Sequence, residues 1–88
     1  MKGLFYVYML RCADGSLYTG QTNNLEERLR QHSEGIGAKY VRSRRPFHLA
    51  YVEEVGSRSE ALKGEMALRK LTKAEKEFLV RGFYLNKM

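Results

Sequence analysis

The fold of this chain is set by residues 5–21, whose sequence is FYVYMLRCADGSLYTGQ. Two runs of aromatic, β-branched and apolar residues, 5–11 and 16–21, flank the turn residues Ala13-Asp14-Gly15. Such runs on either side of a glycine-containing turn are typical of two adjacent antiparallel strands. The chain is therefore predicted to open with a β-hairpin.

The length of the turn determines which side chains of this hairpin share a face. A two-residue Asp14-Gly15 turn puts Tyr8 and Tyr18 on opposite faces, because side chains alternate strictly along a strand. A three-residue loop with Gly15 in the left-handed conformation puts both tyrosines on one face, and it is also a common hairpin connection. The local sequence is compatible with both turns.

A helix is expected directly after the hairpin. Asn23 is a good N-cap residue, and Glu26 follows it three positions later. Four residues then follow the spacing of one helical face: Leu25, Arg28, Leu29 and His32. This helix should end near Gly35, and residues 38–45 should form a short helix or an ordered loop that stops at Pro46.

The second half of the chain predicts one strand and two helices. Residues 47–55 are rich in β-branched and aromatic side chains, which indicates a third strand. Ser57 with Glu60 and Thr72 with Glu75 each have the spacing of a capping box. The helices that follow are expected to reach Leu71 and, from Lys73, Gly82, with Phe78 and Leu79 in the core. The predicted element order is β-β-α-α-β-α-α, an α/β (α+β) fold.

Size and composition indicate one domain, residues 1–88, because the sequence contains no repeat, linker or low-complexity tract. Cys12 is the single cysteine, so no internal disulfide can form. This favours a reducing compartment, and we expect a cytoplasmic protein. The longest apolar run, residues 4–10, is too short to span a bilayer, so no membrane association is expected.

The positive charge is unevenly distributed. The formal net charge is +6, and the sequence pI is about 9.7. Between residues 28 and 45 the one acidic residue is Glu34, and the basic residues are Arg28, Arg30, Lys39, Arg42, Arg44 and Arg45. A block of this kind favours a polyanionic partner such as a nucleic acid.

Two predicted helices place charged residues within their apolar stripes. Arg28 and His32 share a face with leucines, and Glu65 lies among Ala61, Leu62, Met66 and Leu68. Burying a charge costs several kcal/mol unless the charge is paired or binds a ligand. One explanation is a structural ion pair between Arg28 and Glu65. The other is a phosphodiester site, in which Arg28 binds phosphate oxygens and Glu65 holds a divalent ion.

At this point the sequence resembles a known family, the GIY-YIG nuclease superfamily. Tyr6-Val7-Tyr8 and Tyr18-Thr19-Gly20 resemble the two tripeptides that name it. Asn24-Leu25-Glu26-Glu27-Arg28-Leu29 resembles the helix that carries its arginine, and Ala61-Leu62-Lys63-Gly64-Glu65 the helix that carries its glutamate. Within the superfamily the chain is most similar to the small stand-alone bacterial UPF0213 proteins.

This resemblance implies a three-stranded antiparallel sheet flanked by helices and a metal-dependent endonuclease that hydrolyses DNA phosphodiester bonds. It implies that Glu65 holds one Mg²⁺ or Mn²⁺ and that Arg28 stabilises the transition state. Tyr8 and Tyr18 would lie beside the attacking water, one of them as general base, with His32 next to them. Such a site requires the three-residue hairpin loop.

The implied substrate is DNA, including branched or flapped DNA in repair or recombination. Four residues are expected to bind it: Lys39, Arg42, Arg44 and Arg45. Gln21 and Glu77 replace a lysine and an asparagine of some relatives, and Tyr6 replaces a glycine, so we expect weak or partner-dependent activity, with a protein partner for targeting. The alternative is a non-catalytic nucleic-acid-binding module that retains the nuclease fold.

Overall fold

β1, residues Phe5–Arg11, is the central strand of a three-stranded antiparallel sheet. The computed structural model describes residues 4–86. β2 (Leu17–Thr22) and β3 (His48–Val55) flank β1 in the order β2-β1-β3. Both faces of β1 are buried, Val7 and Met9 on one side and Tyr8 and Leu10 on the other. An almost continuous apolar run is what a strand buried on both faces requires.

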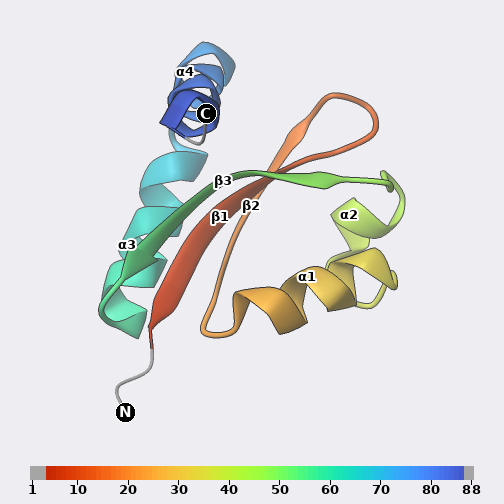
Figure 1. Ribbon diagram of the computed structural model, residues 1–88, viewed down its shortest axis with the longest axis horizontal. Coiled ribbons are helices and arrows are strands. Elements are labelled where there is room, and N and C mark those ends of the chain that lie inside the picture. The colour runs from red at the N-terminus through yellow and green to blue at the C-terminus, as the bar shows by residue number, and fades with distance from the viewer. Residues whose placement is uncertain (1–3, 87–88) are drawn as a thin grey trace.

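Helices cover both faces of the sheet (Figure 1). α1 (Leu25–Ser33) and the short α2 (Lys39–Arg42) lie on one face, and α3 (Arg58–Arg69) and α4 (Lys73–Asn86) lie on the other. The predicted element order β-β-α-α-β-α-α and the three-stranded antiparallel sheet are therefore confirmed. Within residues 4–86 no helix has the length and apolar character needed to cross a membrane.

The hairpin has the three-residue loop. Tyr8 pairs with Gly20 and Leu10 pairs with Tyr18, which puts both tyrosines on the same face. The amide of Gly15 donates to the carbonyl of Cys12 at 2.9 Å, and Gly15 has a φ of 86°. Only glycine adopts this left-handed conformation at little cost, so Gly15 sets the register on which the site depends.

The helix boundaries differ from the prediction at three places, of which one is the end of α3 at Arg69 and not at Leu71. The N-cap of α1 is Asn24, whose side chain accepts from the amide of Glu27, and not Asn23. α4 continues through Gly82 to Asn86. Leu79 packs against the core as predicted, whereas Phe78 is 76% exposed, so its assignment to the core was wrong.

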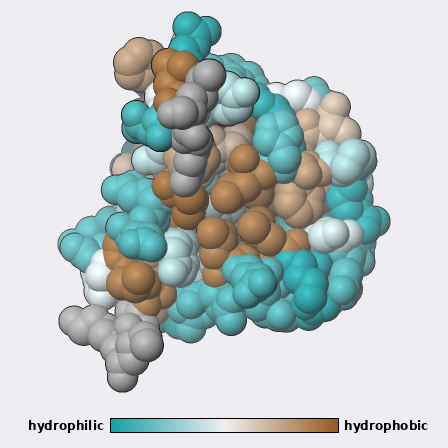
Figure 2. Space-filling view, viewed as in Figure 1, coloured by the Kyte–Doolittle hydropathy of each residue, from teal (hydrophilic) through white to brown (hydrophobic). Residues whose placement is uncertain are grey.

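Figure 2 shows apolar atoms gathered at the centre of one face, between α1 and the α3–α4 pair, where β3 crosses. β3 is an edge strand, and its partly buried side chains Tyr51 and Val55 pack on one apolar cluster while Leu49 and Val52 pack on the other. The side chains beneath belong to the two apolar clusters that β1 separates. The core is therefore thin, as expected for a domain of this size.

Candidate active site

Two tyrosines and a histidine come together on the face of the sheet that α1 covers. Tyr8 lies on β1, Tyr18 on β2 and His32 on α1. A 2.8 Å hydrogen bond joins Oη of Tyr8 to Nε2 of His32, and the ring centroids of Tyr18 and His32 are 5.5 Å apart. These three predicted site residues therefore form one cluster.

Two glycines make room for this cluster. A Cβ atom on Gly20 would lie 2.6 Å from Oη of Tyr8, and one on Gly37 would lie 2.5 Å from Nδ1 of His32. Side-chain atoms cannot approach a buried ring this closely, so a larger residue at either position would displace a ring. Gly20 ends the second tripeptide, but its packing role could not be read from the sequence.

Tyr8 and His32 are both held in their neutral forms. His32 is fully buried, and this burial, followed by the positive charge of Arg28, lowers its pKa to about 4. Burial raises the pKa of Tyr8 to about 12, although hydrogen bonding and charge from Arg28 act in the opposite direction. Nδ1 of His32 has no hydrogen-bond partner among the described residues. Neither group is therefore ready to exchange a proton at neutral pH.

Arg28 lies half-buried beside this cluster on α1. Its Nη1 donates a 3.0 Å hydrogen bond to Oε1 of Gln31, and in residues 4–86 it makes no ion pair. A guanidinium has five N–H donors, so most of them are left for an oxyanion. The structural ion pair between Arg28 and Glu65 is therefore not present.

Glu65 lies on α3, across the sheet from α1, and is paired with Arg69 one turn along the same helix. Nε of Arg69 donates to Oε2 of Glu65 at 2.9 Å, and Nη2 of Arg69 donates to the carbonyl of Thr19 at 3.2 Å. The negative charge of Glu65 also contributes to the raised pKa of Tyr8. Through Arg69, Glu65 is therefore linked to the backbone of Thr19 on β2, the residue next to Tyr18.

The buried face of α3 is narrower than its sequence suggested. Ala61 and Leu68 are buried, but Leu62 and Met66 are 44% and 58% exposed. Glu65, with its side chain 20% exposed, therefore lies at the margin of the buried face and not within an apolar stripe. The inference that Glu65 is a buried charge was wrong, and its partner Arg69 was not anticipated, although the i, i+4 spacing offered a signal.

The residues near Glu65 fit an ion such as Mg²⁺, which keeps several water ligands, better than a metal ion that is bound by three or more side chains. Within residues 4–86 no cluster of three or more histidine, cysteine, aspartate or glutamate side chains is placed to hold a metal. Magnesium commonly keeps several water ligands and is bound through one or two carboxylates. In the described part of the chain, the bonds from Arg69 to Glu65 use Oε2, which leaves Oε1 for such an ion.

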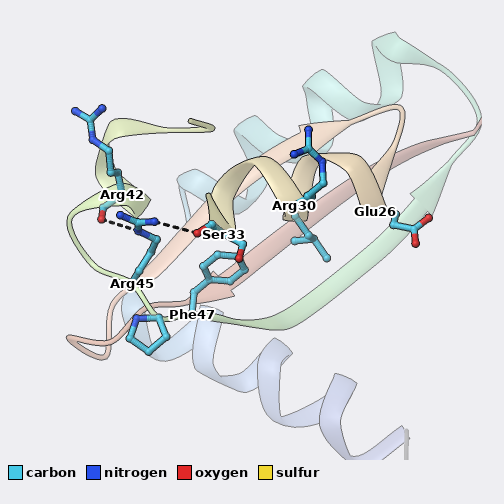
Figure 3. Close-up of a pocket in the computed structure, with 8 residues that line it drawn as sticks. Glu26, Arg30, Ser33, Arg42, Arg45 and Phe47 are labelled. Carbon is cyan, nitrogen blue, oxygen red and sulfur yellow. Dashed lines mark hydrogen bonds between the residues drawn. The ribbon is translucent and has the colours of Figure 1, made fainter. Parts of the chain in front are cut away.

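The predicted DNA-binding residues divide into two groups. Arg42 and Arg45 line a groove of about 790 Å³ between α1 and α2, and Arg45 donates to the carbonyls of Ser33 and Arg42 (Figure 3). Lys39 and Arg44 lie outside this groove. The guanidinium of Arg44 instead pairs with an aspartate of the hairpin loop and lies over an aromatic ring of α2.

Comparison with known proteins identifies the family. The model of the GIY-YIG catalytic domain matches residues 4–78. A UPF0213 protein of Oceanobacillus iheyensis is 52% identical over 75 residues, which cover 85% of this chain and 87% of that protein. A UPF0213 protein of Bacillus licheniformis is 49% identical over 72 residues, covering 82% of this chain and 74% of that protein.

Solved structures agree with this similarity. The solution NMR structure of a UPF0213 protein from Bacillus halodurans has 42% sequence identity and a TM-score of 0.59, covering 89% of this chain and 83% of that one. The solution NMR structure of a protein from E. faecalis has 41% identity and a TM-score of 0.61, covering 97% and 93%. The similarity in sequence and in fold thus extends over the hairpin and both site helices, and this chain belongs to the GIY-YIG catalytic domain family.

Proposed function

We propose that this protein is a metal-dependent endonuclease that hydrolyses DNA phosphodiester bonds. The observation that carries the proposal is the placement of Tyr18 at the edge of the sheet. His32 and Arg28 lie on one side of it, on α1, and Glu65 approaches from α3 on the other. A phenol, a guanidinium and a carboxylate at one solvent-facing edge are suited to phosphoryl chemistry.

The two tyrosines have different proposed roles. Tyr8 is fully buried, bonded to His32 and has its pKa raised to about 12, so it is a poor proton acceptor. Tyr18 is half-buried and lines a surface groove, where a water molecule can reach its phenol. Tyr18 is therefore proposed to position the attacking water and, in its phenolate form, to take the proton of that water. Tyr8 and His32 are proposed to fix the position of the Tyr18 ring.

Arg28 and Glu65 are proposed to offset the negative charge of the phosphate, Arg28 directly and Glu65 by holding a divalent ion. Arg28 donates two hydrogen bonds to the phosphate oxygens, on which negative charge increases in the transition state. Glu65 would hold Mg²⁺ or Mn²⁺ through its carboxylate. When bound, such an ion would supply charge neutralisation at the phosphate and at the leaving oxygen.

The DNA backbone is proposed to bind along α2 through four basic residues: Lys39, Arg42, Arg44 and Arg45. Contacts with phosphates carry no direct information about base sequence. We therefore propose that the protein selects its substrate by DNA shape and acts on branched or flapped DNA, which occurs in repair and recombination.

Cleavage of flap, junction, duplex and single-stranded DNA with Mg²⁺ or Mn²⁺ tests the proposal. Glu65→Gln should lower the cleavage rate by more than about 100-fold, because it removes the metal ligand without a large change of shape. Glu54→Gln, which removes an exposed glutamate of β3, is the matched control and should cleave like the unsubstituted protein. Equal cleavage by the Glu65 and Glu54 variants would refute the assigned site.

The alternative is a nucleic-acid-binding module without turnover. It is favoured by the ion pair of Glu65 with Arg69, which occupies one oxygen of the proposed metal ligand. Such a module would bind DNA in a salt-dependent manner and show no metal-dependent cleavage of any substrate in the panel. The same set of substrates therefore separates the two functions.

A further inference from the structure

Tyr18 lines a second groove, which shares no residue with the α1–α2 groove of Figure 3. Its volume is about 430 Å³, which is within the range of about 300–1,000 Å³ of typical small-ligand sites. β2, α2, α3 and α4 all contribute to its walls, through Leu17, Tyr18, Thr19, Tyr40, Arg69 and Lys76. It therefore joins the candidate active site to the first turn of α4.

The charged side chains that line this groove are both cationic. Arg69 is held in place by Oε2 of Glu65 and the carbonyl of Thr19, which engage its Nε and Nη2 atoms. Its Nη1 makes no hydrogen bond or ion pair with the residues that the structure describes, so two N–H donors remain for a ligand. Lys76 is half-buried, and among the described residues its ammonium has no ion-pair or hydrogen-bond partner. The charge of Arg69 is partly offset by Glu65, whereas Lys76 lines the same groove with no carboxylate partner in residues 4–86, and this favours an anionic ligand there.

The opposite wall is aromatic. The rings of Tyr18 and Tyr40 are stacked, with centroids 5.9 Å apart and an interplanar angle of 26°. The guanidinium carbon of Arg44 lies 3.7 Å from the centroid of Tyr40, which is 38% exposed. Aromatic faces next to a cationic track are typical of sites for single-stranded nucleic acid, where phosphates bind the cations and bases stack.

We propose that this groove binds the substrate strand next to the scissile phosphate. Lys76 and Nη1 of Arg69 hold the neighbouring phosphate, and the attached nucleotide packs against the exposed edge of the Tyr40 ring, whose faces contact Tyr18 and Arg44. This inference rests on the proposed function, because it takes the bond beside Tyr18 as the one that is cut. The groove extends the proposed DNA-binding surface toward α3 and α4, beyond the basic residues of α2.

Lys76 is the better residue for a test, because Arg69 also holds Glu65 and supports β2. Binding of a fluorescein-labelled single-stranded oligodeoxynucleotide is measured by anisotropy in EDTA, with the full chain, so that no cleavage occurs. Lys76→Ala should raise Kd about fivefold and reduce the slope of log Kd against log salt by about 0.7, the loss of one phosphate contact. Lys76→Arg should restore most of the affinity.

Lys63→Ala is the matched control, since it removes the same charge from an exposed position on α3 outside the groove. It should change Kd by less than about twofold. Equal Kd values and equal salt slopes for the Lys63 and Lys76 alanine variants would overturn the inference, as would the absence of any binding at low salt.

The binding result for Lys76→Ala can be interpreted whether or not the protein cleaves DNA. If the protein cleaves DNA and Lys76→Ala binds like Lys63→Ala, the groove assignment is refuted and the nuclease proposal stands. If no substrate is cut but Lys76→Ala alone weakens binding, the groove is a strand-binding site and the nuclease proposal fails.

Discussion

Acidification should destabilise this protein well above the pH at which its carboxylates are protonated, because of His32. This side chain is fully buried and its pKa is lowered to about 4, first by burial and then by the charge of Arg28. In the unfolded chain the pKa returns to about 6.5. Between these two values the unfolded state binds a proton that the folded state does not, so stability falls as the pH falls.

The size of the effect follows from the two pKa values. Between about pH 7 and pH 5 the free energy of unfolding should fall by about 2 kcal/mol, and the full loss at lower pH approaches about 3 kcal/mol. The carboxylates change the free energy of unfolding at lower pH values than His32 does. The bonds from Arg11 and Lys73 lower the pKa of Glu77 to about 2, so its contribution is present above about pH 4.5 and is lost as the pH falls through about 2.

Urea unfolding at several values between about pH 7 and pH 5, followed by far-ultraviolet circular dichroism, measures this loss. His32→Gln should be less stable at neutral pH but should show little dependence on pH in this range. His48→Gln replaces the exposed histidine at the start of β3 and should keep the full dependence. A flat stability profile for the unsubstituted protein, or equal slopes for the two variants, would refute the reasoning. If His32→Gln does not fold, an NMR titration of the His32 ring in the unsubstituted protein decides instead.

Two further substitutions test the packing around the site and the attachment of α4. Gly20→Ala should destabilise the protein by about 1–3 kcal/mol, because its Cβ would lie 2.6 Å from Oη of the buried Tyr8; thermal unfolding measures this, and an unchanged Tm would contradict it. Arg11→Ala removes a two-bond pair with Glu77 at 2.6 and 2.5 Å. Since both side chains are partly exposed, its cost should be about 1 kcal/mol at neutral pH and should decrease as the pH falls through about 2, which urea unfolding at neutral and at acidic pH can check.

The elements of the fold were predictable because each has a local cause. The hairpin depends on strand-forming residues around a glycine turn, and the helices begin at capping residues. The cap of α1 was misplaced by one position because Asn23 with Glu26 and Asn24 with Glu27 have the same pattern. The end of α4 was misplaced because a glycine such as Gly82 commonly ends a helix. In the structure α4 continues to Asn86, and contacts between α4 and β3 such as that of Phe83 with Tyr51 stabilise the additional turn.

The candidate site was predictable in its residue types but not in its pairings. Arg28 and His32 do share a face of α1, as the helical spacing indicated. The partner of Glu65 is Arg69 on its own helix; the i, i+4 spacing allows this pair but does not decide between Arg69 and a cation on another helix. The hairpin register was also left open by the local sequence, since both turns are common, and the family resemblance was needed to choose one.

The arrangement of layers explains why a substrate must approach along one edge of the sheet. β1 is covered on both faces, so the phenol of Tyr8 is closed to solvent. α1 and α3 lie on opposite faces, and their polar side chains can meet only past an edge strand (Figure 1). β2 is that strand, because Tyr18 packs on His32 while the Thr19 carbonyl binds Arg69. A phosphodiester that reaches both helices must therefore cross β2, and Tyr18 is the tyrosine it meets there.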